Sequence, residues 1–163
     1  MHDRFGPPEV LRIEDVPAPI PADDEVLVRV RAATVNQTDC HVRRARPIVW
    51  RFMIGFFRPK WRTLEKEFAG EVEAVGSAVT EFAVGDRVFG MKSYGANAEL
   101  VTVRGSRLVA HLPEDLSFEE GAAVVDGAFQ GLVALRRGRV GKGTRLLVYG
   151  ASGSCGTACV QLG

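Results

Sequence analysis

The sequence predicts a mainly β fold with additional α-helices: a small barrel of short antiparallel strands, followed by the opening β-α of an α/β unit. Residues 25–31 (EVLVRVR) place Val26, Val28 and Val30 on one face and Arg29 and Arg31 on the other, as a half-buried strand does. Between residues 68 and 103 short apolar runs are separated by glycines at short intervals, which is typical of small barrels. Residues 144–162 combine an apolar run, a glycine-spaced turn and a helical pattern.

Length and composition are those of one globular unit. The 163 residues are 46% hydrophobic and carry a net charge of +1, so no global field directs the chain to nucleic acid or an anionic membrane. No apolar run approaches the roughly 18 residues needed to span a bilayer, and we expect no membrane insertion. Three cysteines in no framework spacing favour a reducing, cytoplasmic location.

The predicted β-rich part begins after a connection. The proline-rich residues 17–21 cannot form a central strand and are expected to link the N-terminus to the strand over residues 25–31. Further strands are predicted over residues 68–75, 86–89 and 98–103.

A long helix is predicted to follow over residues 117–137. Ser117 and Glu120 have the spacing of a capping box, in which each side chain accepts a hydrogen bond from the other's backbone N–H. Asp126 and Gly127 could divide this helix into two pieces. Residues 144–149 (TRLLVY) then predict a short strand buried on both faces, as in a parallel sheet.

A glycine-spaced turn after this strand is the strongest local indication of a ligand. Gly150, Ser152, Gly153 and Gly156 lie where a strand would lead into a helix, and such turns bind the pyrophosphate of a dinucleotide. The spacing G-x-x-G-x-x-G departs from the usual first G-x-G, so a purely structural turn is the alternative. The ribose-binding acid expected about 20 residues further on lies beyond Gly163. Cys155 and Cys159, four residues apart, are expected to be packing residues rather than a redox pair.

Several motifs in a fixed order resemble the medium-chain dehydrogenases/reductases, and within them the zinc-free NADPH:quinone oxidoreductase-like branch. The resemblance covers nearly the whole chain. It rests on residues 4–11 (RFGPPEVL), 33–39 (ATVNQTD), 68–72 (FAGEV), 84–90 (VGDRVFG), 126–128 (DGA) and 149–153 (YGASG).

This resemblance implies a GroES-like β-barrel catalytic domain over residues 1–115, and a connecting helix with the start of a Rossmann domain over residues 116–163. It also implies an oxidoreductase that transfers hydride from NADPH, with NAD as the other option, to a quinone or an α,β-unsaturated carbonyl compound. A homodimer is expected. With most of a Rossmann domain outside these residues, we expect the isolated chain to be inactive and to bind NADPH weakly or not at all.

The same resemblance predicts that no zinc is bound. Zinc-dependent relatives carry a Cys where this chain has Asn36 and a His where it has Lys66. An ammonium group is no zinc ligand, and the adjacent Cys40 and His41 do not replace the missing pair.

The resemblance also nominates site residues. Asn36 is the candidate polar group beside the nicotinamide, with a turn-forming Asn as the alternative. Asp39 either orients its neighbours at the site or caps a helix. Gln130, where the branch usually has Thr, either contacts the cofactor or lies on the helix surface. Lys66 and Glu67 are expected to form a simple surface pair, with a catalytic role as the alternative.

An aromatic segment over residues 47–61 supplies candidates for a substrate pocket, foremost Trp50 and Phe56. Asn97, which replaces a frequent aromatic residue, is the third candidate. The alternatives for the segment are packing against the barrel, exposure, or binding of a membrane surface through its interleaved arginines. The segment's large side chains are Trp50, Phe52, Met53, Phe56, Phe57 and Trp61.

A second function class stays open from sequence. The GroES-like part could be a non-catalytic binding or oligomerising module, in which the apolar end over residues 154–163 pairs with another copy.

Overall fold

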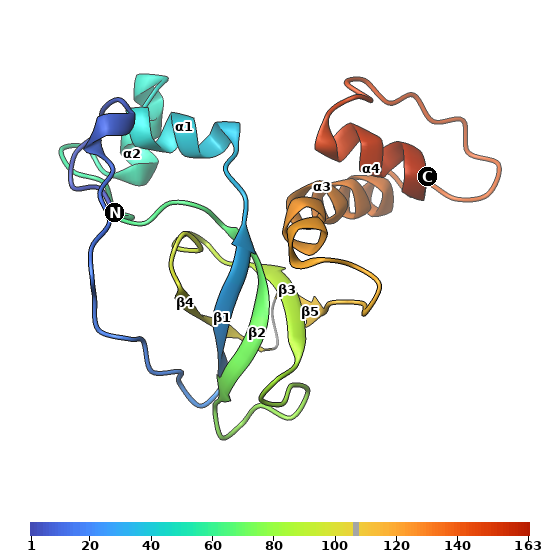
Figure 1. Ribbon diagram of the computed structural model, residues 1–163. Helices are drawn as coiled ribbons and strands as arrows, with labels where there is room; N and C mark the ends of the chain where they lie inside the picture. Colours follow the sequence, from blue (N-terminus) through green and yellow to red (C-terminus); the bar gives the residue numbers. More distant parts are fainter. Residues whose placement is uncertain (106–107) are drawn as a thin grey trace.

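The computed structural model describes residues 1–105 and 108–163, and Figure 1 shows a curled sheet with helices along one end. The strands are β1 (Glu25–Ala33), β2 (Glu67–Val75), β3 (Arg87–Met91), β4 (Leu100–Arg104) and β5 (Val109–His111). The helices are α1 (Gln37–Arg44), α2 (Arg51–Ile54), α3 (Phe118–Arg137) and α4 (Ser154–Leu162), with two short 3-10 turns at Pro8–Val10 and Ile48–Trp50.

The five strands form one antiparallel sheet in the order β4-β1-β2-β3-β5. The four strands predicted from alternation and glycine spacing are confirmed, to within one or two residues at most ends. The three-residue β5, which pairs with β3, was not predicted. Residues 17–21 contain no regular structure, as expected for a connection.

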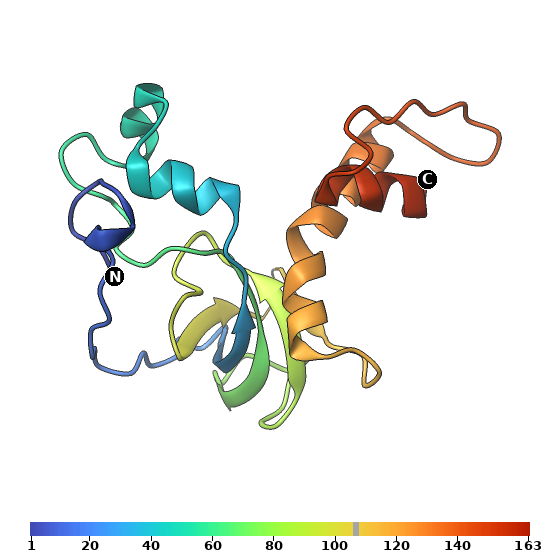
Figure 2. The same ribbon diagram turned by 45° about the horizontal axis from the view of Figure 1, so that its top comes forward.

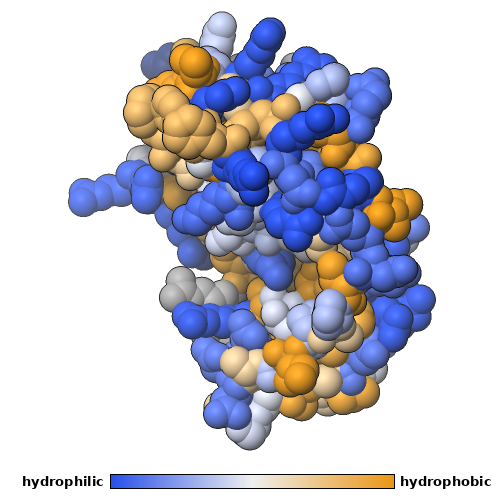
Figure 3. All heavy atoms as spheres, turned by 90° about the vertical axis from the view of Figure 1, so that its left-hand side faces the viewer, coloured by the Kyte–Doolittle hydropathy of each residue, from blue (hydrophilic) through white to orange (hydrophobic). Residues whose placement is uncertain are grey.

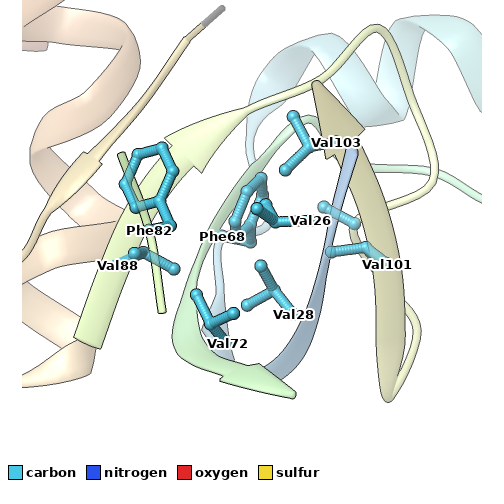
Figure 4. Close-up of a cluster of buried hydrophobic side chains, with 9 residues drawn as sticks. Val26, Val28, Phe68, Val72, Phe82, Val88, Val101 and Val103 are labelled. Carbon is cyan, nitrogen blue, oxygen red and sulfur yellow. The ribbon is translucent and has the colours of Figure 1, made fainter. Parts of the chain in front are cut away.

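The sheet curls around an apolar core (Figure 4). Val26 and Val28 point from β1 into this core, because the alternation of the strand directs every second side chain inward. Phe82, from the loop between β2 and β3, packs against them from a different part of the chain. The remaining buried members are Phe68, Val72, Val88, Ala96, Val101 and Val103.

Helix α3 packs on β1, β2 and β3 and carries α4 on its other side. The predicted capping box is present, with Glu120 N donating to Ser117 Oγ at 3.1 Å and Ser117 N donating to Glu120 Oε2 at 2.8 Å. The helix continues through Asp126 and Gly127 without a break. Gly127 lies against Ser154 and Gly131 against Ala158, so these glycines allow close packing of α4.

The predicted strand over residues 144–149 does not form. Leu147 and Tyr149 are more than nine-tenths exposed instead of buried on both faces. A parallel strand needs a neighbour for its backbone groups, and no strand of the described residues lies beside this run. The helix predicted to follow the turn is present as α4.

A second small apolar cluster supports α1 and α2. It consists of Val42 and Ala45 from α1 and its C-cap, Ile54 from α2, and Leu64. Trp61 stacks on Tyr94 at its edge, with ring centroids 4.2 Å apart. Among the described residues, no helix is long and apolar enough to cross a bilayer.

Candidate functional site

Asn36 lies between the end of β1 and the start of α1, where it is half-buried. Its Oδ1 accepts hydrogen bonds from Thr38 N at 2.8 Å and from Asp39 N at 3.3 Å. Asp39 returns a bond, since its Oδ2 accepts from Asn36 N at 3.2 Å. Asn36 and Asp39 therefore form a capping box for α1. The cap uses the oxygen of the Asn36 side chain and leaves its amide N–H groups for another partner.

Asp39 links this cap to the strand that follows in the sheet. It is buried, and its second oxygen, Oδ1, accepts a hydrogen bond from Glu65 N at 2.9 Å. The structure thus brings the predicted pair Asn36 and Asp39 together with Glu65, just before β2. The structure shows the helix cap that was one alternative for Asp39. Its carboxyl bonds the backbone N–H groups of Asn36 and Glu65, and the orientation of neighbouring side chains at the site stays a prediction.

Glu65 is fully buried, and its backbone is in the left-handed region with φ at 68°. Its Oε1 accepts hydrogen bonds from Lys66 N at 2.9 Å and Glu67 N at 3.0 Å. Its Oε2 has no hydrogen-bond partner among the described residues. A conformation that is unusual for a residue with a side chain is held here by hydrogen bonds on both sides of the residue.

Thr34 joins two carboxyl groups at this point. Its hydroxyl lies 2.9 Å from Glu65 Oε1 and is also within hydrogen-bond distance of Glu67 Oε2. Because this hydroxyl has a single proton, it can donate to only one of the two carboxyl groups at a time.

Glu67 extends the network to α3. Its Oε1 accepts a hydrogen bond from Asp126 N at 2.8 Å, in the middle of the helix. Asp126 Oδ2 in turn accepts from Gln130 Nε2 at 2.6 Å. The chain of polar contacts therefore runs from Asn36 through Asp39, Glu65 and Glu67 to Gln130. Gln130 is exposed at its end, one residue before the glycine that seats α4.

The electrostatics of this network centre on Glu65. Burial, followed by the neighbouring carboxyl of Asp39, raises the pKa of Glu65 to about 7. Burial, and then the charges of Asp39 and Glu65, also raise the pKa of Tyr94. Glu65 can therefore hold or release a proton near neutral pH, while Tyr94 stays a phenol.

The expected surface pair of Lys66 and Glu67 is wrong. Glu67 is buried because α3 covers this end of β2, and it binds Asp126 and Thr34 rather than Lys66. Lys66 is half-buried, and its ammonium lies 5.0 Å from the centre of the Tyr94 ring.

The glycine-rich turn leads into α4 as predicted. Gly150 has φ at 76°, and a Cβ at Gly156 would clash with the carbonyl oxygen of Gly150, so both positions require glycine. Gly153 is the N-cap of α4 and, having no side chain, makes no capping hydrogen bond to the first turn of this helix. Ser152 is exposed in the same turn. Uncapped N–H groups at a helix start are the groups that bind a phosphate.

The cysteines of α4 are free thiols. Cys159 is buried with its sulfur 4.0 Å from the carbonyl oxygen of Gly131, which agrees with a packing role.

The three candidates for a substrate pocket stay predictions. The side chain of Trp50 lies outside the described part of the structure. Phe56 is half exposed, and Asn97 is exposed in the loop before β4, with its N–H donating to Leu64 O at 3.2 Å.

Sequence reasoning missed Glu65, Thr34 and the role of Glu67. Acidic residues are expected at the surface, and nothing in the local alternation marks these two glutamates as buried. One indication was available: they flank Lys66, which the resemblance places at a position that binds zinc in other members.

The comparisons with known proteins agree with this architecture. Residues 22–139 match the alcohol dehydrogenase GroES-like domain, and the chain belongs to that family. The predicted resemblance to quinone oxidoreductase-like medium-chain dehydrogenases/reductases is thereby confirmed.

Individual relatives are quinone oxidoreductases. The chain is 36% identical to the quinone oxidoreductase of Lama guanicoe, over 97% of this chain and 46% of that protein. The structure of the quinone oxidoreductase from Coxiella burnetii is 29% identical, with a TM-score of 0.82 over 99% of this chain and 51% of that one. The Escherichia coli quinone oxidoreductase complexed with NADPH is 30% identical, with a TM-score of 0.69 over 84% and 40% of the two chains. The chain spans about half the length of these relatives.

Proposed function

We propose that the natural protein carrying this chain is a zinc-independent oxidoreductase, which transfers hydride from NADPH to quinone-like or α,β-unsaturated carbonyl acceptors. The observation that carries the proposal is the polar network from Asn36 to Gln130. It connects the candidate catalytic end of the sheet to α3, on which the helix after the glycine-rich turn, α4, is packed. The quinone oxidoreductases among the relatives, one of them complexed with NADPH, supply the reaction class.

The residues divide into those that hold the cofactor and those that handle the acceptor. Gly150, Ser152, Gly153 and Gly156 would hold the pyrophosphate with the uncapped N–H groups at the start of α4. Gln130 would contact the cofactor from α3. NADPH, when bound, supplies the hydride.

Asn36 would act on the acceptor. Its amide N–H groups, unused by the cap, would stabilise negative charge on the acceptor oxygen. Asp39 holds Asn36 in place through the capping box and is a positioning residue in this proposal. Trp50, Phe56 and Asn97 stay the candidates for the acceptor pocket.

Zinc does not suit the residues at this position. Catalytic zinc takes three Cys, His or carboxylate ligands, whereas Asn36 and Lys66 occupy the positions where zinc-dependent relatives have theirs. His41 is engaged elsewhere, with Nδ1 3.0 Å from Arg46 O. The described residues contain no cluster of three or more metal-binding side chains.

The test is NADPH oxidation by the protein expressed from its complete reading frame, with a quinone and an enone as acceptors and with and without a chelator. We expect turnover that the chelator leaves unchanged and that Asn36→Ala lowers at least tenfold. Alcohol oxidation that the chelator abolishes would overturn the proposal. If neither acceptor reacts and no NADPH binds, the alternative of a non-catalytic binding or oligomerising module holds.

The isolated residues 1–163 are proposed to be inactive by themselves. The glycine-rich turn has no parallel strands beside it in the described structure, and a dinucleotide site needs them. Calorimetry should give weak or no NADPH binding, and tight saturable binding would contradict this. We also propose that the catalytic domain ends at residue 115, that the natural protein is a homodimer, and that it is located in the cytoplasm.

A further inference from the structure

The charges of the chain are unevenly distributed along the sequence. Residues 40–64 contain seven arginines and lysines and no acidic residue, while the other 138 residues hold 14 basic and all 20 acidic residues. The small net charge of the whole chain therefore conceals a strongly cationic segment. This segment also contains both tryptophans.

The same segment exposes its large apolar side chains. Helix α2 is a single turn that buries only Ile54, so its other apolar side chains face outward. Six are more than half exposed: Ile48, Val49, Phe52, Met53, Phe56 and Phe57. A contiguous apolar surface of this kind marks an interaction site rather than ordinary surface.

The shape of this surface is fixed by contacts within the segment. Phe56 makes edge-to-face contacts with Phe52 at 5.9 Å and with Phe57 at 5.0 Å between ring centroids. Ile54 anchors the turn, since its carbonyl oxygen accepts from Lys60 N at 2.7 Å.

Four basic side chains of the segment make no ion pair within the described part of the chain: Arg44, Arg46, Arg58 and Lys60, the last with its ammonium 5.3 Å from the centre of the Trp61 ring. They are exposed. The other basic residues of the segment are engaged. Arg43 is buried and donates to Gly6 O at 2.6 Å, Arg51 lies over the Phe5 ring, and Arg62 pairs with Asp3 and Glu14. We name the six apolar residues and these four basic residues the cationic aromatic face. Phe56 is thereby assigned to this face, and Trp50 and Asn97 remain the candidates for the acceptor pocket.

The face lies away from the glycine-rich turn. Figures 1 and 2 place α2 and the following loop on the side of the molecule opposite α3 and α4. Seen from that side in Figure 3, apolar atoms gather near the upper end and are bordered by hydrophilic ones. Neither α3 nor the α4 helix packed on it covers this face.

We propose that the cationic aromatic face binds the anionic surface of a lipid membrane, with the chain lying on the bilayer and not spanning it. Phenylalanine and aliphatic side chains enter the boundary between headgroups and acyl chains, while arginines and lysines around them meet anionic headgroups. Nucleic acid suits the face less well. Base stacking would use the phenylalanine rings alone and would leave the exposed aliphatic side chains of Ile48, Val49 and Met53 in contact with water.

The test is cosedimentation of the purified natural protein with vesicles of phosphatidylcholine alone or mixed with phosphatidylglycerol. Binding is expected to the mixed vesicles only, to weaken with salt, and to shift tryptophan emission to the blue. Each basic residue near an anionic surface contributes roughly fivefold in affinity, so Arg58→Glu with Lys60→Glu should weaken binding at least tenfold. Phe52→Ser with Phe57→Ser should also weaken it.

A matched control reverses the same number of charges elsewhere. Arg136→Glu with Arg139→Glu, both exposed at the end of α3, should leave vesicle binding unchanged. Circular dichroism checks that every variant is folded. The proposal is overturned if the folded protein ignores mixed vesicles at low salt, or if the control loses binding equally. It is also overturned if the wild type binds RNA or a second copy of itself but no vesicles, and if the face variants lose that binding.

Discussion

Replacing Glu65 by Gln should change how the stability of the protein depends on pH. Glu65 is fully buried and beside Asp39, which together raise its pKa to about 7 from an ordinary value of 4.5. Gln is the uncharged counterpart of the protonated acid. It keeps the oxygen that accepts from Lys66 N and Glu67 N.

The direction follows from proton linkage. Below about pH 4.5 the carboxyl is protonated in both states, and its favourable contribution is fully present. As pH rises towards 7 the unfolded chain releases this proton while the folded protein retains it, so the free energy of unfolding falls. The difference between the pKa of Glu65 in the unfolded chain and in the folded protein lowers the free energy of unfolding by at most about 3 kcal/mol.

The assay is urea unfolding of the wild type and Glu65→Gln from about pH 5 to about pH 8. We expect the wild type to lose stability relative to the variant over this range, and the two to differ little at the acid end. Glu99→Gln, an exposed carboxyl, should follow the wild type. Parallel curves for wild type and Glu65→Gln would refute the reasoning, because they would mean that Glu65 titrates alike in both states.

Three further changes test the packing. Phe68→Ala, in the core of the sheet, should lower the free energy of unfolding, measured by chemical denaturation, by about 3 to 5 kcal/mol. A decrease below about 1 kcal/mol would contradict the burial of Phe68. Ser117→Ala removes the cap of α3 and should lower the free energy of unfolding by about 1 kcal/mol in the same assay. Ser93→Ala, at an exposed serine, is the control and should leave it unchanged. Gly131→Val would push against Ala158, so hydrogen exchange of α4 amides should accelerate; unchanged exchange would show that α4 is not held there.

Local pattern was sufficient for the sheet and the long helix. β1 was predicted because three valines alternate along it, and two of them, Val26 and Val28, enter the core; Leu27 between them is also buried. α3 was predicted because its cap is encoded by Ser117 and Glu120. β5 is too short for any periodicity to be read. Residues 144–149 have the composition of a buried strand but lack a neighbour, and composition alone does not encode pairing.

The candidate site was predicted only in part, because its connections are long-range. Asn36, Asp39 and Gln130 were chosen from the resemblance, and the structure joins them through Glu65 and Glu67. Their hydrogen bonds cross 26 residues from Asp39 to Glu65 and 59 from Glu67 to Asp126. A local sequence pattern does not show which residues this far apart in the chain form hydrogen bonds. Acidic residues are also usually exposed, so the sequence gives no reason to expect Glu65 and Glu67 to be buried.

The proposal of hydride transfer is tested most directly by isotope transfer. The protein expressed from its complete reading frame is supplied with NADPH that carries deuterium at both C4 positions of the nicotinamide and with an enone acceptor, and the reduced product is analysed by mass spectrometry. Direct transfer predicts one deuterium in each molecule of product, and Asn36→Ala should form at least tenfold less of this labelled product in the same time. An unlabelled product, or no reduction by the folded protein, would contradict the proposed oxidoreductase function.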